Sequence, residues 1–545
     1  MRKIFFAALL AVTATLQGYA QTARPKLVVG LMVDQMRWDY LYRFADRYGE
    51  DGFKRLLGEG FSCENTLLNY IPTVTAIGHS SVYTGSVPSI HGIAGNDWIV
   101  QATGQPMYCT QDDNVQPIGT TDPESKQSPR NLLASTITDQ LKLATNFQSK
   151  VIGIAMKDRG GILPAGHFAD AAYWMENASG NWVTSSFYMD KLPSWVEQFN
   201  AKKLPETYLK QDWNTLYPLD TYTLSTADDT PYEGKWPGEK APTFPRKTSE
   251  LMKDAGMELI KTTPQGNTIT LDFAKTAIEQ EQLGNNPTGS TDFLCVSLSS
   301  TDYIGHRYSL SAVEIEDTYL RLDRDIANFL AYLDKTVGKG NYTFFLSADH
   351  AASYNPMYYT DHKGNAGYLF TRQIQRNVNA ALQEQFGNDQ LVSSLLNYQV
   401  QLNYALIDSL QLDEKAVKQS IIKSLNKEEG IAYVVDMEDN QNMFIPAAIR
   451  EKVINGYNRK NSGAIQIIAE PQWYSGSPRS TGTTHGVWSA YDSHIPLLFM
   501  GWGIQQGVSN KAVEVVDIAP TLAALLHIME PNGSIGKPIV EALGQ

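Results

Sequence analysis

Short apolar runs alternate along the chain with stretches of helical periodicity. Helical spacing is clearest over Ala312–Val337, and Pro520 marks the first turn of a closing helix. This alternation predicts an α/β fold with a mostly parallel central sheet flanked by helices. The predicted strands are rich in β-branched and aromatic residues: Leu27–Val33, Val151–Met156, Asp292–Leu298, Thr343–Ser347, Ala464–Ile468 and Pro496–Met500.

Two stretches interrupt this alternation. Residues 182 to about 265 are rich in Trp, Tyr, Pro and Asp and show weak periodicity, which predicts a long insertion that covers the functional site. Residues 366 to about 460 combine two helical stretches with a strand-like segment and predict a small α+β insertion. We therefore predict one catalytic domain over residues 21–545, with insertions at about 182–265 and 366–460.

The first twenty residues have the features of an export signal. A basic start, Met1–Lys3, precedes an apolar stretch and a small-x-small cleavage site at Gly18–Ala20. The apolar stretch is too short for a membrane span, and no cysteine follows the cleavage site. We predict that residues 1–20 are a signal peptide and that the mature protein, starting near Gln21, is periplasmic without stable membrane association.

Charge and cysteine content narrow the function classes. The formal net charge of −13 argues against binding to nucleic acid or anionic membrane, because both require a basic surface. An anionic substrate would need a locally positive site. Cys63, Cys109 and Cys295 are too few for a disulfide scaffold. A monomer is compatible with these features, which leave the oligomeric state open.

Candidate chemistry lies on or just after the ends of separate apolar runs. In an open α/β sheet these strand ends converge on one crevice, so residues distant in sequence can meet there. A D-x3-H pair, one helical turn apart or across a tight loop, can chelate one ion, and mixed Asp/His ligation suits Zn²⁺ better than Mg²⁺. Each short motif is weak alone, but their joint occurrence favours a metal-dependent hydrolase. The residues are Asp34, Thr75, Asp302, His306, Asp349, His350 and His485.

A basic pair follows the predicted strand Val151–Met156. Alternate residues of an extended segment share a face, so Lys157 and Arg159 are expected to reach one anion while Asp158 points away. Arginine offers a planar fork to phosphoryl oxygens, and lysine offers a point charge. The alternative for an isolated pair of this kind is a solvated loop.

Together these motifs resemble the alkaline phosphatase superfamily and, more closely, its periplasmic PafA-like phosphate-irrepressible members, which use a threonine nucleophile. The resemblance implies that Thr75 is the nucleophile, that Lys157 and Arg159 contact the transferred phosphoryl group, and that Asn96 donates to a phosphoryl oxygen. It also implies two Zn²⁺ ions, one held by Asp302, His306 and His485, the other by Asp34, Asp349 and His350 and also touching Thr75. The motifs are VDQMRWDY, PTVTAIGH, HGIAGNDW, KDR, STDYIGH, SADH, GTTH, YDSHIPLLFMGWG and DIAPT.

The expected activity is hydrolysis of small-molecule phosphate monoesters, with broad specificity and a covalent phosphothreonine intermediate. Two metal ions can stabilise the attacking and leaving oxygens of an in-line displacement, and a bound cation lowers the pKa of a coordinated hydroxyl. A phosphodiesterase or nucleotide pyrophosphatase on the same core is the alternative enzyme, although it is expected to lack the Lys157/Arg159 pair. A metal-binding relative without catalysis is a further alternative. The sequence around Thr75 and Cys63 lacks the sulfatase motif.

Two other features bear on this site. Ala351 follows the Asp–His pair where the resembling proteins commonly have glycine, and its methyl group is expected to be tolerated. His79 and His91 flank the region of Thr75 and are expected to be hydrogen-bonded scaffold residues rather than metal ligands.

Overall fold

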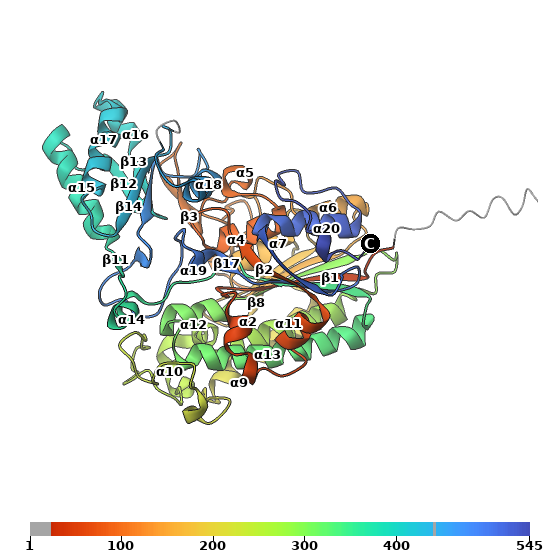
Figure 1. Cartoon of the computed structure of the whole chain (residues 1–545). Helices are drawn as coiled ribbons and strands as arrows, with labels where there is room; N and C mark the ends of the chain where they lie inside the picture. Colours follow the sequence, from red (N-terminus) through yellow and green to blue (C-terminus); the bar gives the residue numbers. More distant parts are fainter. Residues whose placement is uncertain (1–22, 440–442, 545) are drawn as a thin grey trace, which may run out of the picture.

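An eleven-stranded mixed sheet forms the centre of the computed structural model, which describes residues 23–439 and 443–544 (Figure 1). Its five middle strands are parallel, and β1, β9 and β10 are buried along their whole length, as expected for strands covered on both faces. The predicted α/β fold with a mostly parallel central sheet is confirmed. In spatial order these strands are β10 (Tyr342–Ser347), β1 (Leu27–Val33), β9 (Asp292–Leu298), β6 (Val151–Ala155) and β7 (Ala171–Met175).

Further strands, most of them paired antiparallel, extend the sheet on both sides, and β19 (Gly507–Glu514) alone among them pairs in parallel. Beside β10 lies β18 (Leu497–Gly501), followed by β2 (Phe61–Leu67), which also pairs with β17 (His494–Ile495) and β19. Beyond β7 the sheet ends with two short strands, β8 (Trp182–Ser185) and β5 (Pro117–Ile118).

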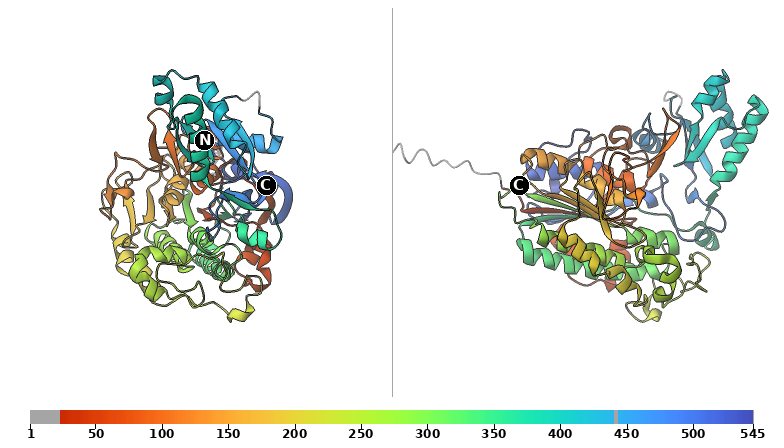
Figure 2. Two further views of the ribbon diagram at one scale, coloured as in Figure 1. Left: turned by 90° about the vertical axis from the view of Figure 1, so that its left-hand side faces the viewer. Right: turned by 180° about the vertical axis from the view of Figure 1, so that it is seen from behind.

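Helices cover both faces of this sheet (Figures 1 and 2). The predicted helix Ala312–Val337 corresponds to α13, which continues as a short π-helix over Asp334–Gly338. On its side of the sheet lie α11 (Gln265–Gln280), α12 (Ser300–Tyr308) and α13 (Val313–Leu333). On the other side lie α4 (Thr75–Thr84), α6 (Ile137–Ala144), α7 (Asp158–Ala165) and α20 (Ile518–Leu526).

A smaller lobe stands beside the central sheet (Figures 1 and 2). Four strands, α15 (Thr371–Phe386) and α17 (Glu414–Leu425) enclose a separate hydrophobic cluster there. The predicted strand Ala464–Ile468 is β15 of this small sheet, so its assignment to the central sheet was wrong. A buried strand has the same apolar pattern in either sheet, and the pattern alone does not separate them. The strands, in order, are β12 (Val392–Leu396), β13 (Gln399–Leu402), β15 (Ile465–Ala469) and β14 (Ile431–Asp436).

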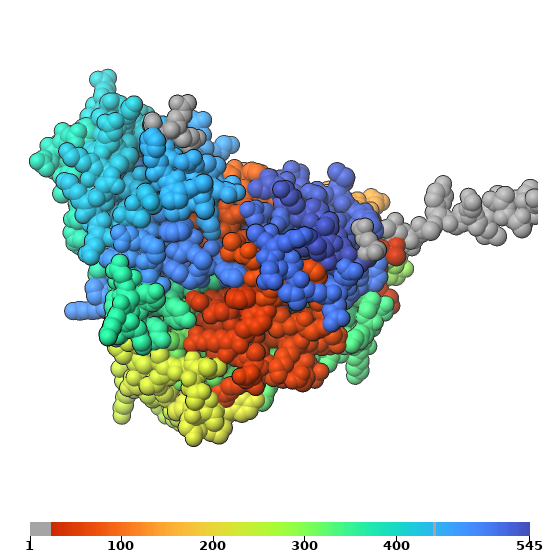
Figure 3. Space-filling model, in the orientation of Figure 1, coloured from red at the N-terminus to blue at the C-terminus, as the bar shows by residue number. Residues whose placement is uncertain are grey.

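The aromatic segment 182–265 packs against α12 and α13, and Figure 3 shows its yellow part at the lower edge of the molecule. Arg246 is 1 % exposed and forms ion pairs with Glu239 and with Glu314 of α13. The Tyr232 carbonyl accepts a hydrogen bond from Gly482, three residues before His485. The segment therefore lies next to the loop that carries a predicted ligand. The division into one domain with two insertions stays a prediction. The α-helices of this segment are α8 (Ser194–Ala201), α9 (Leu204–Leu209) and α10 (Thr248–Ala255).

Other sequence predictions concern membrane association, the cysteines and the signal peptide. In the part of the chain that the structure describes, none of the helices has the length and apolar character needed to cross a bilayer. Cys63, Cys109 and Cys295 are all buried and none forms a disulfide. The predicted signal peptide lies outside the described residues.

Candidate active site

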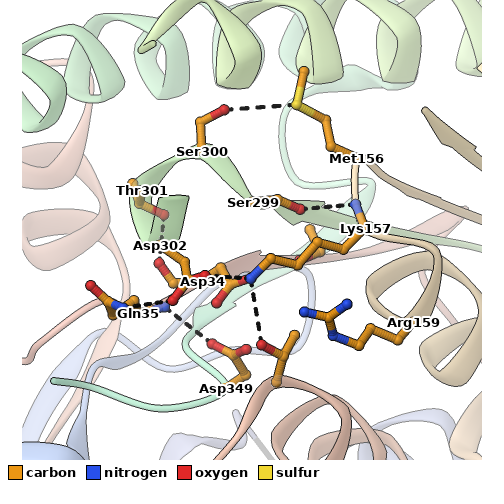
Figure 4. Close-up of polar contacts among 12 residues, drawn as sticks. Asp34, Gln35, Met156, Lys157, Arg159, Ser299, Ser300, Thr301, Asp302 and Asp349 are labelled. Atoms are coloured by element: carbon orange, nitrogen blue, oxygen red, sulfur yellow. Dashed lines mark hydrogen bonds and ion pairs between the residues drawn. The ribbon is translucent and has the colours of Figure 1, made fainter. Parts of the chain in front are cut away.

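The carboxyl ends of the parallel strands bring four charged residues together (Figure 4). Asp34 directly follows β1, Lys157 follows β6, and Asp349 follows β10. Asp302 lies in the first turn of α12, the helix after β9. All four are buried, with at most 4 % of each residue exposed. The predicted convergence at one edge of the sheet is therefore observed for these residues.

Asp302, His306 and His485 form the first cluster. The Nε2 atoms of the two histidines lie 3.3 Å apart, at 3.1 Å (His306) and 3.6 Å (His485) from Oδ1 of Asp302. Each Nδ1 lies close to a backbone carbonyl, 2.8 Å from Thr483 for His306 and 2.6 Å from Thr73 for His485. Because a carbonyl only accepts, each Nδ1 carries the proton and each Nε2 is free to bind a cation.

The two histidines of this cluster come from different kinds of segment. His306 is one turn after Asp302 in α12. Of the two arrangements considered for this pair, one helical turn or a tight loop, the helical turn is observed. His485 lies in the loop between β16 (Trp473–Ser475) and α19 (Ala490–Ser493), rather than after a strand of the central sheet.

Asp34, Asp349 and His350 form the second cluster. The Nε2 atom of His350 lies 3.6 Å from Oδ1 of Asp34 and 3.4 Å from Oδ2 of Asp349. These two carboxylate oxygens are buried and accept no hydrogen bond. The ring of His350 stacks on that of His485 at a centroid distance of 3.5 Å, so the two clusters adjoin. Accordingly, Asp302, His350 and His485 also have ligand atoms within 4.8 Å of one another.

The electrostatics of the clusters favour cation binding. Burial, and next the charge of Asp349, raises the pKa of Asp34 well above its usual value. Although burial alone would raise it, the neighbouring His306 and Lys157 hold the pKa of Asp302 well below its usual value. Burial lowers the pKa of His485 well below its usual value, which keeps it in the neutral form that binds metals. Three buried carboxylates thus face a single lysine ammonium.

Thr75 begins α4 and lies beside both clusters. Its Oγ1 is 3.5 Å from Nε2 of His350 and 3.5 Å from Nζ of Lys157. Gly78, in the same helical turn, packs directly on the backbone of Asp349, because an added Cβ would lie only 2.1 Å from the Asp349 carbonyl oxygen. This close approach holds the hydroxyl group next to the second cluster, at the positive end of the helix.

The predicted phosphoryl-binding residues face the same space (Figure 4 shows Lys157 and Arg159). Nζ of Lys157 lies 2.7 Å from Oδ2 of Asp34 and 2.5 Å from Oδ2 of Asp302. The side-chain oxygen Oδ1 of Asn96 accepts a hydrogen bond of 2.9 Å from the backbone N–H of Ala76, which leaves the side-chain NH₂ group of Asn96 as a donor. Sequence-distant segments thus bring three candidate donors, Lys157, Arg159 and Asn96, together with the hydroxyl of Thr75.

The local geometry of Lys157 and Arg159 differs from the prediction. Lys157 caps α7, which starts at Asp158, so the segment is not extended through Arg159. The two side chains meet because the chain turns from strand into helix between them. Asp158 accepts a hydrogen bond of 2.5 Å from the hydroxyl of Tyr108, which in turn accepts one of 3.0 Å from Nη1 of Arg159. Tyr108 was not identified from the sequence.

Gln35 is a second residue that sequence analysis missed. Its side-chain Nε2 donates to Oδ1 of Asp302 at 2.6 Å, and its backbone N–H donates to Oδ1 of Asp349 at 3.2 Å. Its φ of +65° is unfavourable for a residue with a side chain. An added Cβ at Gly305 would lie 1.9 Å from Oε1 of Gln35, so a larger residue there would have to displace the Gln35 side chain. For Gln35, the position next to Asp34 was the only signal in the sequence.

Three scaffold predictions agree with the geometry. His79 contacts the Thr75 carbonyl at 2.9 Å and the hydroxyl of Ser297 at 2.8 Å. His91 contacts the hydroxyl of Ser81 at 3.2 Å. Ala351 does not adopt a positive φ, so its methyl group is accommodated without backbone strain.

Replacing Gln35 with alanine is expected to weaken metal binding by about 10- to 100-fold, because Asp302 loses the donor that orients it. The measurement is metal affinity, determined by competition with a chromogenic chelator. Gln35→Gly is the matched control, since it removes the same side chain but also relieves the backbone strain at φ +65°. Unchanged affinity in both variants would show that the contact with Asp302 does not position the ligand.

Comparison with known proteins relates this arrangement to characterised sequences. Residues 28–492 match the model of the family described as type I phosphodiesterase / nucleotide pyrophosphatase. The chain is 63 % identical over 522 residues to a protein of Myroides odoratus named calcium-transporting ATPase, with 96 % of this chain and 95 % of the relative covered. It is 50 % identical over 525 residues to alkaline phosphatase PafA of Elizabethkingia meningoseptica, with 96 % and 95 % covered. The crystal structure of wild-type PafA superposes with a TM-score of 0.93 at 49 % identity, covering 96 % of this chain and 100 % of that chain.

Proposed function

Since the chain belongs to the type I phosphodiesterase / nucleotide pyrophosphatase family and, within the alkaline phosphatase superfamily, to the PafA-like alkaline phosphatases, we propose that it hydrolyses phosphate monoesters with two zinc ions and a phosphothreonine intermediate at Thr75. The enzyme is an alkaline phosphatase, a phosphoric monoester hydrolase. The resemblance stated from the motifs is thereby confirmed. The observation that carries the mechanistic proposal is the buried Thr75 hydroxyl at a helix start, beside two Asp/His clusters and Lys157.

The residues present fit a pair of zinc ions. Unpartnered buried oxygens on Asp34 and Asp349 are costly unless a cation binds them. Mixed carboxylate and imidazole ligands are typical of zinc. The first ion would be held by Asp302, His306 and His485, and the second by Asp34, Asp349 and His350. Bound there, the two ions would supply Lewis acidity, which lowers the pKa of a coordinated hydroxyl and stabilises negative charge on attacking and leaving oxygens.

The protein's own residues then carry out two displacements. The Thr75 hydroxyl loses its proton to solvent and its Oγ attacks phosphorus as the bond from phosphorus to the ester oxygen breaks. The departing oxygen takes a proton from solvent and leaves as the alcohol, so the number of protons balances. A water molecule next attacks the phosphothreonine, which releases inorganic phosphate and restores the Thr75 hydroxyl. Each displacement inverts phosphorus, so the whole reaction proceeds with retention. The start of α4 favours the negative charge that develops at this position.

Lys157, Arg159 and Asn96 would hold the phosphoryl oxygens. With cations bound to Asp34 and Asp302, the Lys157 ammonium would exchange its contacts with these carboxylates for a phosphoryl oxygen. The guanidinium of Arg159 offers a planar fork, and the NH₂ group of Asn96 offers a further donor. A monoester dianion has enough free oxygens to use these contacts, whereas a diester has one fewer. This supports a phosphomonoesterase over the phosphodiesterase alternative.

Export is a further part of the proposal. Residues 1–20 have the features of a signal peptide, which would place the mature enzyme in the periplasm.

The test compares kcat/KM for an aryl phosphate monoester and its methyl diester, on zinc-loaded protein and on protein treated with a chelator. We expect kcat/KM of the zinc-loaded enzyme to be more than about tenfold higher for the monoester than for the diester, because the additional charged oxygen of the monoester contacts charged donors. Chelation should remove both activities, and zinc should restore them better than magnesium. A diester preference would overturn the substrate assignment. Activity that survives complete zinc removal would overturn the metal assignment.

A further inference from the structure

A cavity of about 580 Å³ opens next to the candidate active site. Lys157 and Arg159 line it, and its walls also include Trp174, Asn177 and Lys261. Its size is in the range of small-molecule binding sites. A phosphate monoester held by Lys157 and Arg159 can therefore place the rest of its structure in this cavity.

Lys261 is a buried cation in the wall of this cavity. It lies in the 3₁₀-helix Gly256–Thr262 and is only 4 % exposed. Its ammonium group donates to the side-chain oxygen of Asn177, a neutral acceptor, and among the described residues it forms no salt bridge. Two of its three N–H donors are thus free. A buried ammonium without a carboxylate is unfavourable, and its place in a cavity wall points to an anionic ligand.

Tyr303 connects Lys261 to the active site. Nζ of Lys157 lies 5.0 Å from the centroid of its ring, and Nζ of Lys261 lies 5.6 Å from the same centroid, so the two ammonium groups are at most about 11 Å apart. This separation suits a molecule that presents its phosphoryl group to Lys157 and a second anion to Lys261. Tyr303 directly follows Asp302, which fixes this spacing relative to the first cluster.

Six carboxylates line the cavity, and among the described residues none of them forms a salt bridge with Lys261, although the charge of Lys261 contributes to lowering the pKa of Glu176. They are Asp97, Asp113, Asp122, Glu124, Asp158 and Glu176. Glu176 is buried, but its Oε1 accepts a hydrogen bond of 2.9 Å from the Ala178 N–H, and its Oε2 accepts one of 2.8 Å from the Ser179 N–H. Its side chain is therefore occupied by its own turn. Asp97, Asp113 and Glu124 are exposed, where water screens their charge. Asp122 accepts a hydrogen bond from the Glu124 N–H, and Asp158 accepts one from the hydroxyl of Tyr108.

We propose that Lys261 binds a second anionic group on the leaving group of the substrate, a carboxylate or a phosphate. The preferred substrates are then phosphate monoesters whose leaving group is itself negatively charged. This inference rests on the proposed function, because it requires the transferred phosphoryl group to lie at Thr75 and Lys157. Lys261 acts in this scheme as a determinant of specificity and takes no part in the chemical step.

The experiment uses three aryl monoesters on the zinc-loaded enzyme: 3-carboxyphenyl phosphate, benzene-1,3-bisphosphate and the neutral isostere 3-carbamoylphenyl phosphate. Lys261→Met keeps the apolar stem and removes the charge. We expect kcat/KM for both anionic substrates to fall by about 10- to 100-fold, mainly through KM, because a charged hydrogen bond is lost. The value for the neutral isostere should stay within about twofold. A loss confined to the bisphosphate would identify phosphate as the anion, and a loss confined to the carboxylate would identify carboxylate.

Lys261→Arg is the matched control, and it should retain the preference for anionic substrates because it keeps the charge. Equal losses on all three substrates, or no loss on any, would overturn the assignment of Lys261. If Lys261→Met does not fold, the wild-type ratio of kcat/KM for the carboxy and carbamoyl substrates should fall as salt is added. A ratio insensitive to salt would also overturn it. Failure of the wild-type enzyme to hydrolyse any of the three would instead contradict the proposed function.

Discussion

Replacing Thr75 with alanine is expected to reduce turnover of phosphate monoesters by at least about a thousandfold, because it removes the attacking oxygen. Zinc content should stay close to that of the wild type, since all six Asp and His side chains of the two clusters remain. Measurement of kcat together with metal content by mass spectrometry checks both parts. Loss of zinc in the variant would mean that Thr75 stabilises the clusters and would leave its role as nucleophile unsupported.

Thr75→Ser provides the control for this experiment. It keeps a hydroxyl group at the start of α4 and loses only a methyl group, so activity should be retained in large part. The covalent intermediate is measured directly by acid quench of the wild-type enzyme during turnover, followed by peptide mapping of the phosphate. Phosphate on Thr75 is the expected result. Substantial turnover in Thr75→Ala, or phosphate on another residue, would contradict the assignment of the nucleophile.

Replacing both Lys157 and Arg159 with alanine is expected to lower kcat/KM for a monoester by about 100- to 10,000-fold, because two charged hydrogen bonds to the phosphoryl group are lost. The loss for a methyl diester should be much smaller, because it has one fewer charged oxygen to stabilise. The ratio of the two values is the quantity to measure. Similar losses on both substrates would contradict the role assigned to this pair.

Two controls separate this effect from structural damage. Arg159→Lys keeps the charge but loses the planar fork, so a partial loss is expected if bidentate contact matters. Zinc content must be measured in the double variant, because Nζ of Lys157 lies within 2.7 Å of both Asp34 and Asp302. A change in zinc content would require the comparison to be repeated at saturating metal.

The central fold and most of the candidate site were predictable from the sequence. The bounds of strands β1 and β9 match the prediction. Each is a continuous apolar run with an aspartate after its end, Asp34 for β1 and Asp302 for β9, and this pattern is distinctive. The placement of β15 was wrong because sheet membership depends on long-range pairing, which local periodicity does not encode. The same limit applies to Lys157 and Arg159, whose side chains were predicted together but for a different local reason.

Residues that act through other residues were the least predictable. Gln35 contacts Asp302 across the sheet, and Lys261 reaches the cavity from the aromatic segment. Gln35 stands in the motif VDQMRWDY but no role was assigned to it there, and Lys261 belongs to none of the motifs named above. Each has an ordinary alternative as a solvated side chain. Only the packing of distant segments shows that Gln35 bridges two carboxylates and that the Lys261 ammonium is buried with a neutral side-chain oxygen, that of Asn177, as its hydrogen-bond partner.

The residues of the clusters come from opposite ends of the chain. Asp34 directly follows the first strand, and His485 lies close to the last part of the sheet. No short folding unit contains a complete set, so high-affinity metal capture has to follow global folding rather than nucleate it. Each ion bound there would lower the free energy of the native state alone, because the unfolded chain offers no comparable site. The candidate active site would thereby also stabilise the completed fold. The lifetime of the folded protein would then depend on the metal supply.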